Sequence, residues 1–393
     1  MAEAEDTALL ASIKHPTLLS SLPPSALPQP GGGPNSPRLI IIGDVHGQLS
    51  ALDALLAKAG YSSERGDTVV FTGDMINKGP NSGGVVDRAI AMGAYGVRGN
   101  HEDKVLRAWA KHKNHKKKKH SKHKHKHGHH SSKAEAEAEG DSIADGEKGE
   151  QDVVVVEEED NTEEEEPLSL TDFADLATAS RLTPTHRHWL ANLPVILRVG
   201  TVSPRYGDVV VVHAGLVPGV PLEKQDAWAV MNMRTLLSST PVSPLQKHSP
   251  HHLEPSEGRE GRPWASVWNE LEKEKQKKKK GKGDRTTVVY GHDAKTGLKI
   301  RRYAFGLDSN CCRGGELTAL VFEAADAVSF AAEGDRGYES SSGEEESVRK
   351  HGITHRLVSV SCEAAVPDDD DDKGGKKKDK SEDKHKDEGK DQK

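Results

Sequence analysis

Residues 39–47 read LIIIGDVHG, and they give the clearest indication of the fold. Its first four residues are large and aliphatic, which predicts a short buried strand that ends in a loop at the Gly-Asp pair. The pattern returns at residues 69–74, VVFTGD. Between the two, residues 52–59 carry leucines at helical spacing, and Gly60 stops the helix. Strands and helices that alternate in this way predict an α/β domain.

Five short motifs follow predicted strands, and each contains glycine. They are Gly43-Asp44-Val45-His46-Gly47, Gly73-Asp74-Met75, Gly99-Asn100-His101-Glu102, His213-Ala214-Gly215 and Gly291-His292-Asp293. Open α/β sheets bind ligands at the carboxyl ends of their strands, so loops far apart in the sequence can converge there. One Gly-Asp pair alone indicates nothing, because these residues also fill ordinary turns. The five together, in this order, indicate a functional site.

The polar residues in these motifs are those of a metal site with nitrogen and oxygen ligands. Six candidate ligands are present: Asp44, His46, Asp74, Asn100, His213 and His292. Six exceed the four that one tetrahedral zinc ion takes, and they suit two ions that share a carboxylate. We expect Asp74 to be that bridge. Such a site lowers the pKa of a bound water from ~15.7 towards ~7 and suits the displacement of a phosphoryl group.

The composition limits what kind of protein this is. Of 393 residues, 30% are charged and 34% hydrophobic, and the formal net charge is −7. So polar a chain cannot pack along its whole length, because it has too little apolar surface to offset the ordering entropy. No apolar run approaches the ~20 residues of a membrane helix, so we expect no membrane insertion. Secreted scaffolds and collagens are excluded as well.

Two further observations concern the compartment. The N-terminus carries Glu3, Glu5 and Asp6 where a secretory signal would be basic. The three cysteines, Cys311, Cys312 and Cys362, form no disulfide framework, so we expect free thiols and a reducing compartment. These observations predict a cytoplasmic protein, with delivery to the vacuole by a partner as the alternative.

The charge and composition pattern divides the chain. Residues 1–37 are rich in Pro, Gly and Ser and predict a disordered leader. We expect a structured domain over residues 38–330, with low-complexity inserts at 111–166 and about 238–283. A loop over 331–352, a final strand over 353–366 and a disordered charged tail over 367–393 complete the chain. The Lys/His-rich tract at residues 111–130 could bind metal, nucleic acid or polyphosphate, but a solvated insert is the commoner role, and we expect no nucleic-acid partner. Protein partners could bind the charged tails.

The five motifs resemble those of the calcineurin-like metallophosphoesterases, in the branch of the phosphoprotein phosphatases and the diadenosine tetraphosphatases. The resemblance runs from about Arg38 to Phe322. Finer matches are residues 79–82 (GPNS), 189–194 (WLANLP), 231–234 (MNMR), 264–269 (WASVWN) and 306–309 (GLDS). These look most like the group that includes fungal zinc-dependent endopolyphosphatases. The resemblance implies two mixed β-sheets flanked by helices, with the metals at one edge.

The resemblance also implies roles. The first metal would be bound by Asp44, His46 and Asp74, and the second by Asp74, Asn100, His213 and His292. His101 would be the general acid that protonates the leaving oxygen. Arg234 and Lys78 would contact phosphate oxygens, the first through its planar guanidinium and the second as a point charge. The metals would be two divalent ions among Zn, Mn and Fe, which all accept this ligand set.

One position departs from the pattern. The protein phosphatases have an aspartate that orients and charges the catalytic histidine, and this chain has Asn77 there. A neutral amide raises the histidine pKa less than a carboxylate does. We therefore favour phosphoanhydrides, whose leaving groups need less proton donation, and inorganic polyphosphate first among them. Alternatives are a diadenosine polyphosphate, a phosphoserine or phosphothreonine protein, or a non-catalytic metal-binding scaffold.

Overall fold

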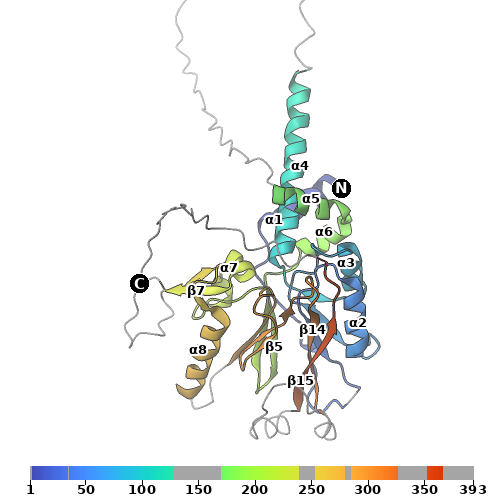
Figure 1. The fold of residues 1–393 in the computed structure, drawn as a ribbon. Coiled ribbons are helices and arrows are strands. Elements are labelled where there is room, and N and C mark those ends of the chain that lie inside the picture. Colours follow the sequence, from blue (N-terminus) through green and yellow to red (C-terminus); the bar gives the residue numbers. More distant parts are fainter. Residues whose placement is uncertain are drawn as a thin grey trace, which may run out of the picture.

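The computed structural model describes residues 2–33, 35–126, 170–238, 253–278, 285–325 and 352–365 (Figure 1). Two six-stranded mixed sheets form its centre. The first sheet has the order β13-β14-β2-β3-β4, with β15 on the other side of β14. Its strands are β2 (Leu39–Ile42), β3 (Thr68–Phe71), β4 (Tyr95–Gly96), β13 (Asp308–Ser309), β14 (Glu316–Ala324) and β15 (Ile353–Ser361).

The second sheet has the order β1-β5-β6-β10-β12-β11. Its strands are β1 (Leu19–Ser21), β5 (Ile196–Ser203), β6 (Gly207–Val212), β10 (Thr286–Tyr290), β11 (Lys299–Ile300) and β12 (Ala304–Gly306). In both sheets the strands that precede the predicted ligands are parallel neighbours: β2 beside β3, and β6 beside β10. Their carboxyl ends therefore reach the same edge of the sheet.

The residue alternation along the strands explains how the sheets stack. Leu39 and Ile41 of β2 face the second sheet and share a core with Val209 and Val211 of β6. Ile40 and Ile42 point the other way, towards helices. Because side chains alternate across a strand, the aliphatic residues of β2 point to both faces of the sheet. Each face must therefore be covered, one by the second sheet and the other by helices. The expected pair of mixed sheets flanked by helices is confirmed.

Helices cover the outer faces of the sheets (Figure 1). On the first sheet these are α2 (Leu49–Ala59), α3 (Ser82–Ala91), α4 (Asn100–Lys126), α5 (Leu170–Arg181) and α6 (Pro184–Ala191). On the second sheet, α7 (Ala227–Asn232) and α8 (Trp264–Lys278) pack through a core that contains Trp264, Val267 and Trp268. A small third sheet joins β7 (Thr235–Ser238) to β8 (Leu253–Ser256) and β9 (Arg262–Pro263). Short 3₁₀ turns lie at Pro24–Ala26 and Leu222–Lys224.

The expected disordered leader is wrong for most of its length. Residues Ala2–Lys14 form helix α1, whose Leu9 and Ile13 are buried in the outer core of the first sheet. Strand β1 follows and pairs in parallel with β5. Composition predicted disorder because residues 23–37 are rich in Pro and Gly. The two apolar residues by which α1 packs, Leu9 and Ile13, change the composition of residues 1–37 very little.

The expected inserts are folded in part. Helix α4 continues past residue 111 to Lys126, so the Lys/His tract begins as a helix. Within 238–283, β8, β9 and α8 are ordered elements. Strand β15 lies inside the range expected for the final strand. The rest of the 111–166 insert, the 331–351 loop and the charged tail lie outside the described residues. In the described part of the chain, no helix combines the length and apolarity needed to cross a bilayer.

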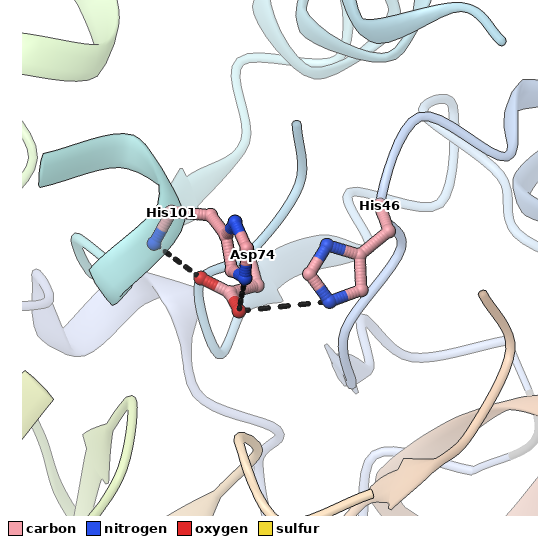
Figure 2. Close-up of side chains that lie close together, drawn as sticks. All are labelled: His46, Asp74 and His101. Carbon is pink, nitrogen blue, oxygen red and sulfur yellow. Dashed lines mark hydrogen bonds and ion pairs between the residues drawn. The ribbon is translucent and has the colours of Figure 1, made fainter. Parts of the chain in front are cut away.

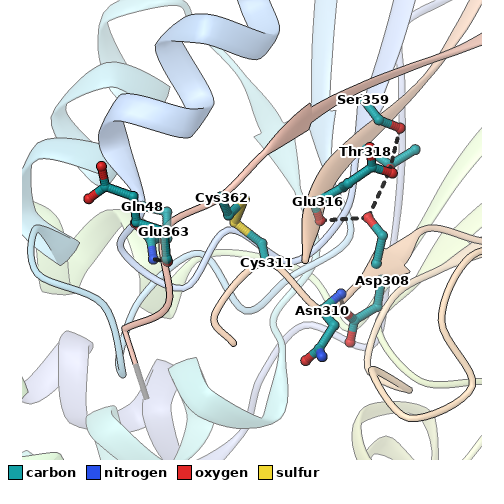
Figure 3. Close-up of a disulfide and its surroundings, with 10 residues drawn as sticks. Gln48, Asp308, Asn310, Cys311, Glu316, Thr318, Ser359, Cys362 and Glu363 are labelled. Carbon is teal, nitrogen blue, oxygen red and sulfur yellow. Dashed lines mark hydrogen bonds between the residues drawn. A yellow bond between two sulfur atoms is a disulfide. The ribbon is translucent and has the colours of Figure 1, made fainter. Parts of the chain in front are cut away.

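A disulfide joins Cys311 to Cys362 (Figure 3). It links the turn after β13 to the residue after β15, with the two Cα atoms 5.2 Å apart. Cys312 is buried and unbonded. The expectation of three free thiols is therefore wrong, and the argument for a reducing compartment loses its support. The sequence could not indicate the pairing, because the two cysteines are 51 residues apart and meet only through the β14–β15 ladder.

Candidate metal centre

The predicted ligands gather at one edge of the two sheets. Asp44 and His46 follow β2, and Asp74 follows β3. Asn100 is the first residue of α4. From the second sheet, His213 follows β6 and His292 follows β10. All six belong to strand ends or to the helix that follows one, which is the arrangement the motifs predict.

Asp74 lies at the centre of this cluster. Figure 2 shows its carboxylate between His46 and His101. Its Oδ2 atom is 3.6 Å from Nε2 of His46 and 3.9 Å from Nε2 of His101. Its Oδ1 atom is 3.4 Å from Nε2 of His213 and accepts a 3.0 Å hydrogen bond from the His101 backbone N–H. Two groups of potential ligands share it: His46 with His101, and Asp44 with His213. The expected bridging position of Asp74 fits this geometry.

The ligand spacing fits divalent ions. Two ligand atoms that each lie ~2.1 Å from one ion in tetrahedral geometry are ~3.4 Å apart. The 3.4 and 3.6 Å separations around Asp74 match that value. Asn100 adds an oxygen, because its Oδ1 atom faces Nε2 of His213 at 3.0 Å. With the amide turned round, the same position would instead donate to Asp74. With the oxygen inward, the cluster is a ring of acceptors, which is the arrangement a cation requires.

Backbone carbonyls orient the three histidine ligands. Nδ1 of His46 faces the carbonyl of Ile76 at 3.3 Å, and Nδ1 of His213 faces that of Thr72 at 2.9 Å. Nε2 of His292 faces the carbonyl of Asn232 at 2.9 Å. In each ring one nitrogen is therefore held by the backbone and the other is left for an ion, as in most histidine metal sites.

Burial and one another's charges shift the pKa values of the groups in this cluster. Burial and the carboxylates of Asp308 and Asp74 raise the pKa of Asp44 well above its usual value. Burial alone would also raise the pKa of Asp74, but the neighbouring histidines, His213 foremost, hold it well below. Burial lowers the pKa of His46 to about 4. The Asp74 charge outweighs burial at His213 and raises its pKa. A cation that binds here would compete with protons for these side chains, so metal affinity should depend on pH.

The loops around the cluster have unusual backbone conformations. His46, Asp74 and His292 have positive φ angles of 46°, 50° and 72°. Positive φ is uncommon outside glycine and often marks functional sites. Gly73, with φ of 95°, has no room for a side chain, since a Cβ there would lie 2.8 Å from Nδ1 of His213. A Cβ on Gly291 would overlap Oδ1 of Asp44. The glycines of two motifs therefore allow the ligands to approach one another.

Glu102 anchors the Asp74 loop. Its fully buried carboxylate accepts backbone hydrogen bonds from Asp74 (2.8 Å), Met75 (2.8 Å), Ile76 (3.2 Å) and Gly99 (2.9 Å). Four donors on one carboxylate tie the ends of β3 and β4 together. Glu102 lies two residues after Asn100 in the motif Gly99-Asn100-His101-Glu102, but the sequence by itself does not show that it supports the ligands.

The two predicted phosphate contacts lie near the cluster on different elements. Arg234, after α7, is partly buried, and its charge contributes to lowering the pKa of His292. Its Nη1 donates to the carbonyl of Glu257 at 3.0 Å. Lys78 is exposed and has a positive φ of 63°, and its charge affects the pKa values of Asp44, His46 and His101. Both cations are therefore within electrostatic range of the ligands, and their roles stay predictions.

Sequence reasoning missed the residues that surround Asn77. Its side-chain amide lies 3.1 Å from Nδ1 of His101, and it also contacts Asp175 and Thr178 of α5. Nothing in the sequence indicates this contact, because α5 follows the acidic insert and lies 98 residues from Asn77. Thr72, whose hydroxyl is 3.4 Å from Oδ1 of Asp44, was missed for a different reason, since it lies between the end of β3 and the Gly73-Asp74-Met75 motif and belongs to no motif itself.

Comparisons with known proteins show what this chain is similar to. The family model for calcineurin-like phosphoesterases matches residues 37–313. A symmetrical bis(5'-nucleosyl)-tetraphosphatase of Proteus mirabilis is 24% identical over 286 residues, which cover 72% of this chain and 93% of the relative. Another, from Acidovorax ebreus, is 39% identical over 72 residues, 18% of this chain and 25% of the relative.

The matches of about 40% identity are short, and in them the chain spans about a quarter of the length of the curated relatives. Among solved structures, one provisionally described as a diadenosine tetraphosphatase has 26% identity over 78% of this chain and 93% of that chain, with a TM-score of 0.49.

Proposed function

Because the chain belongs to the calcineurin-like phosphoesterase family, we propose that it is a two-metal hydrolase of phosphoanhydride bonds. The observation that carries the proposal is the cluster around Asp74, where six predicted ligands meet beside His101 and the neutral Asn77. A metal-dependent phosphohydrolase follows from the family. The choice of phosphoanhydrides is our inference from the residues beside His101.

Two divalent ions would be held by Asp44, His46, Asp74, Asn100, His213 and His292. Bound there, such ions activate water and neutralise charge on the phosphoryl group. The chain's own residues supply the rest. Arg234 and Lys78 would bind phosphate oxygens, and Nε2 of His101 would face the leaving oxygen. Glu102 would keep the Asp74 loop in place during the reaction, through its hydrogen bonds to the backbone of that loop.

We keep inorganic polyphosphate as the first candidate substrate. It is a chain of phosphoanhydride bonds, and its leaving group needs little protonation. Diadenosine tetraphosphate is the second candidate, and the bis(5'-nucleosyl)-tetraphosphatases among the relatives favour it. Both substrates contain the same kind of bond, so the proposal for the reaction does not depend on the choice.

The test compares three substrates on purified protein loaded separately with Zn, Mn or Mg. These are long-chain polyphosphate, diadenosine tetraphosphate and a phosphothreonine peptide. Phosphate release and gel-resolved chain length are measured. We expect rapid cleavage of one or both anhydrides and a rate at least ~100-fold lower on the peptide, since general acid catalysis is worth ~100-fold or more to poor leaving groups. Asp74→Asn should abolish all activity.

Asp53→Asn is the matched control, because Asp53 forms an exposed ion pair with Arg88 at 2.8 Å, away from the strand ends. It should retain full activity. A preference for the peptide would overturn the choice of phosphoanhydrides and favour a protein phosphatase. No hydrolysis of any substrate with any metal would overturn the proposed function.

A further inference from the structure

The side chain of Asn77 connects His101 to helix α5. Its Nδ2 atom donates a 2.8 Å hydrogen bond to Oδ1 of Asp175 and lies 3.1 Å from Nδ1 of His101. Its Oδ1 atom accepts a 3.0 Å hydrogen bond from the hydroxyl of Thr178. Every polar atom of this amide therefore has a partner.

These partners determine which way the amide faces. An ionised carboxylate only accepts hydrogen bonds, so Asp175 requires the NH₂ end of Asn77 on its side. Thr178 donates to the oxygen end, which gives the same orientation. Asn77 is also held by its backbone, because its N–H donates to the Ser82 hydroxyl at 3.0 Å and its φ is 72°. The second N–H of the amide then points at Nδ1 of His101.

We propose that Asp175 is a positioning residue that, through Asn77, keeps His101 in the tautomer with its proton on Nε2. An amide N–H only donates, so Nδ1 of His101 must accept. The ring proton is then on Nε2, the nitrogen that faces Asp74 and the metal cluster, 3.9 Å from the carboxylate.

The consequence is selectivity for good leaving groups, and this part rests on the proposed function. Water adds to phosphorus, and the bond to the leaving oxygen breaks with its electron pair moving to that oxygen. The water oxygen stays on the new phosphate, which keeps or releases the water protons according to pH. With its proton on Nε2, His101 offers the leaving oxygen a hydrogen bond through that N–H, and the group beside its Nδ1 is the amide of Asn77 rather than a carboxylate. A terminal phosphate or a nitrophenolate can leave as an anion with that help, whereas the alkoxide of a serine cannot.

The experiment exchanges the two side chains, so that the carboxylate lies at position 77 and the amide at position 175. The double variant Asn77→Asp with Asp175→Asn keeps a hydrogen bond between positions 77 and 175 but places the carboxylate beside Nδ1 of His101. We measure kcat and KM with Mn for 4-nitrophenyl phosphate, a good leaving group, and phenyl phosphate, a poor one. The double variant should raise kcat/KM for phenyl phosphate relative to 4-nitrophenyl phosphate at least ~10-fold, because a carboxylate lets the histidine act as a full acid.

Two single variants separate positioning from general effects. Asp175→Asn removes the acceptor that orients the amide, so the same ratio should rise by a smaller factor. Asp172→Asn, one turn earlier on α5, removes a carboxylate that pairs with Lys111 at 3.5 Å, and should leave the ratio unchanged. A ratio that stays at the wild-type value in both the double variant and Asp175→Asn would overturn the selectivity.

A second readout does not depend on activity. In protein with ¹⁵N-labelled histidines and no added metal, the His101 ring is identified by its loss in His101→Gln. We expect the shift of an unprotonated nitrogen at Nδ1 in the wild type, and a protonated Nδ1 in the double variant. A protonated Nδ1 in the wild type contradicts the proposal. If no substrate is hydrolysed, the proposed function fails while this measurement still decides the tautomer, and it decides from the wild type alone if the double variant does not fold.

Discussion

At the residue scale, the buried carboxylate of Asp67 has a pH signature that can be measured. It bonds to Arg38 at 2.8 Å and Arg65 at 2.7 Å and accepts from the backbone of Ser62, which ties the starts of β2 and β3 together. Burial alone would raise its pKa, but the hydrogen bonds from the two arginines lower it to about 2. Because the folded pKa lies below the unfolded value, this stabilisation is present above ~pH 4 and is lost as the pH falls towards 2.

We therefore expect Asp67→Asn to cost at least ~2 kcal/mol of unfolding free energy at pH 6. The difference from wild type should shrink at pH 3, because the Asp67 carboxyl of the unfolded chain, whose pKa is ~3.9, is by then mostly protonated. Urea unfolding at the two pH values measures it. Asp53→Asn breaks only an exposed pair and should cost less than ~1 kcal/mol at both. If Asp67→Asn lowers the unfolding free energy equally at pH 6 and pH 3, the lowered pKa of Asp67 is contradicted.

At the element scale, helix α1 is part of the domain. Ile13 is buried in the outer core of the first sheet, and Arg98, itself fully buried, donates to the carbonyls of Ser12 and Ile13. We expect Ile13→Ala to lower the unfolding free energy by ~2–5 kcal/mol, since it removes buried methyl groups and leaves a cavity. Lys14→Ala, on the exposed side of the same helix, should change it by less than ~0.5 kcal/mol.

Chemical denaturation of the two variants decides the matter. Equal stability of Ile13→Ala and Lys14→Ala would mean that α1 does not pack as described, and that the disordered leader expected from composition was the better interpretation.

At the scale of the whole molecule, the Cys311–Cys362 disulfide joins the two ends of the β14–β15 hairpin across 51 residues. A cross-link that closes a loop of this length restricts the unfolded chain and is worth ~4 kcal/mol in the chain-entropy model. We expect Cys311→Ser with Cys362→Ser, or reduction of the wild type, to lower the unfolding free energy by ~2–4 kcal/mol.

Urea unfolding with and without reductant tests this, and thiol titration of the unfolded, unreduced protein should find one thiol. Cys312→Ser is the control that keeps the cross-link, and its stability should still fall on reduction. Three thiols before reduction would restore the sequence-based expectation of a protein with free cysteines.

Much of the metal centre could be predicted from the sequence, because its information is local. A strand of aliphatic residues such as Leu39–Ile42, followed at once by Gly-Asp, specifies both the strand and the turn that presents Asp44. Parallel neighbours then place such ends together whatever lies between them, so the insert after α4 does not disturb the prediction. Asp44, Asp74 and His213 meet because each lies just after a strand that ends at this edge.

Only the tertiary structure decided which distant groups support the site and hold the domain together. Asp175 reaches Asn77 from a helix that begins after the insert, and Cys362 reaches Cys311 through a strand ladder. Helix α1 is stabilised by packing and by Arg98 rather than by a strong pattern of its own. Such contacts depend on side chains that meet after the chain has folded back over long separations, and no local periodicity records them.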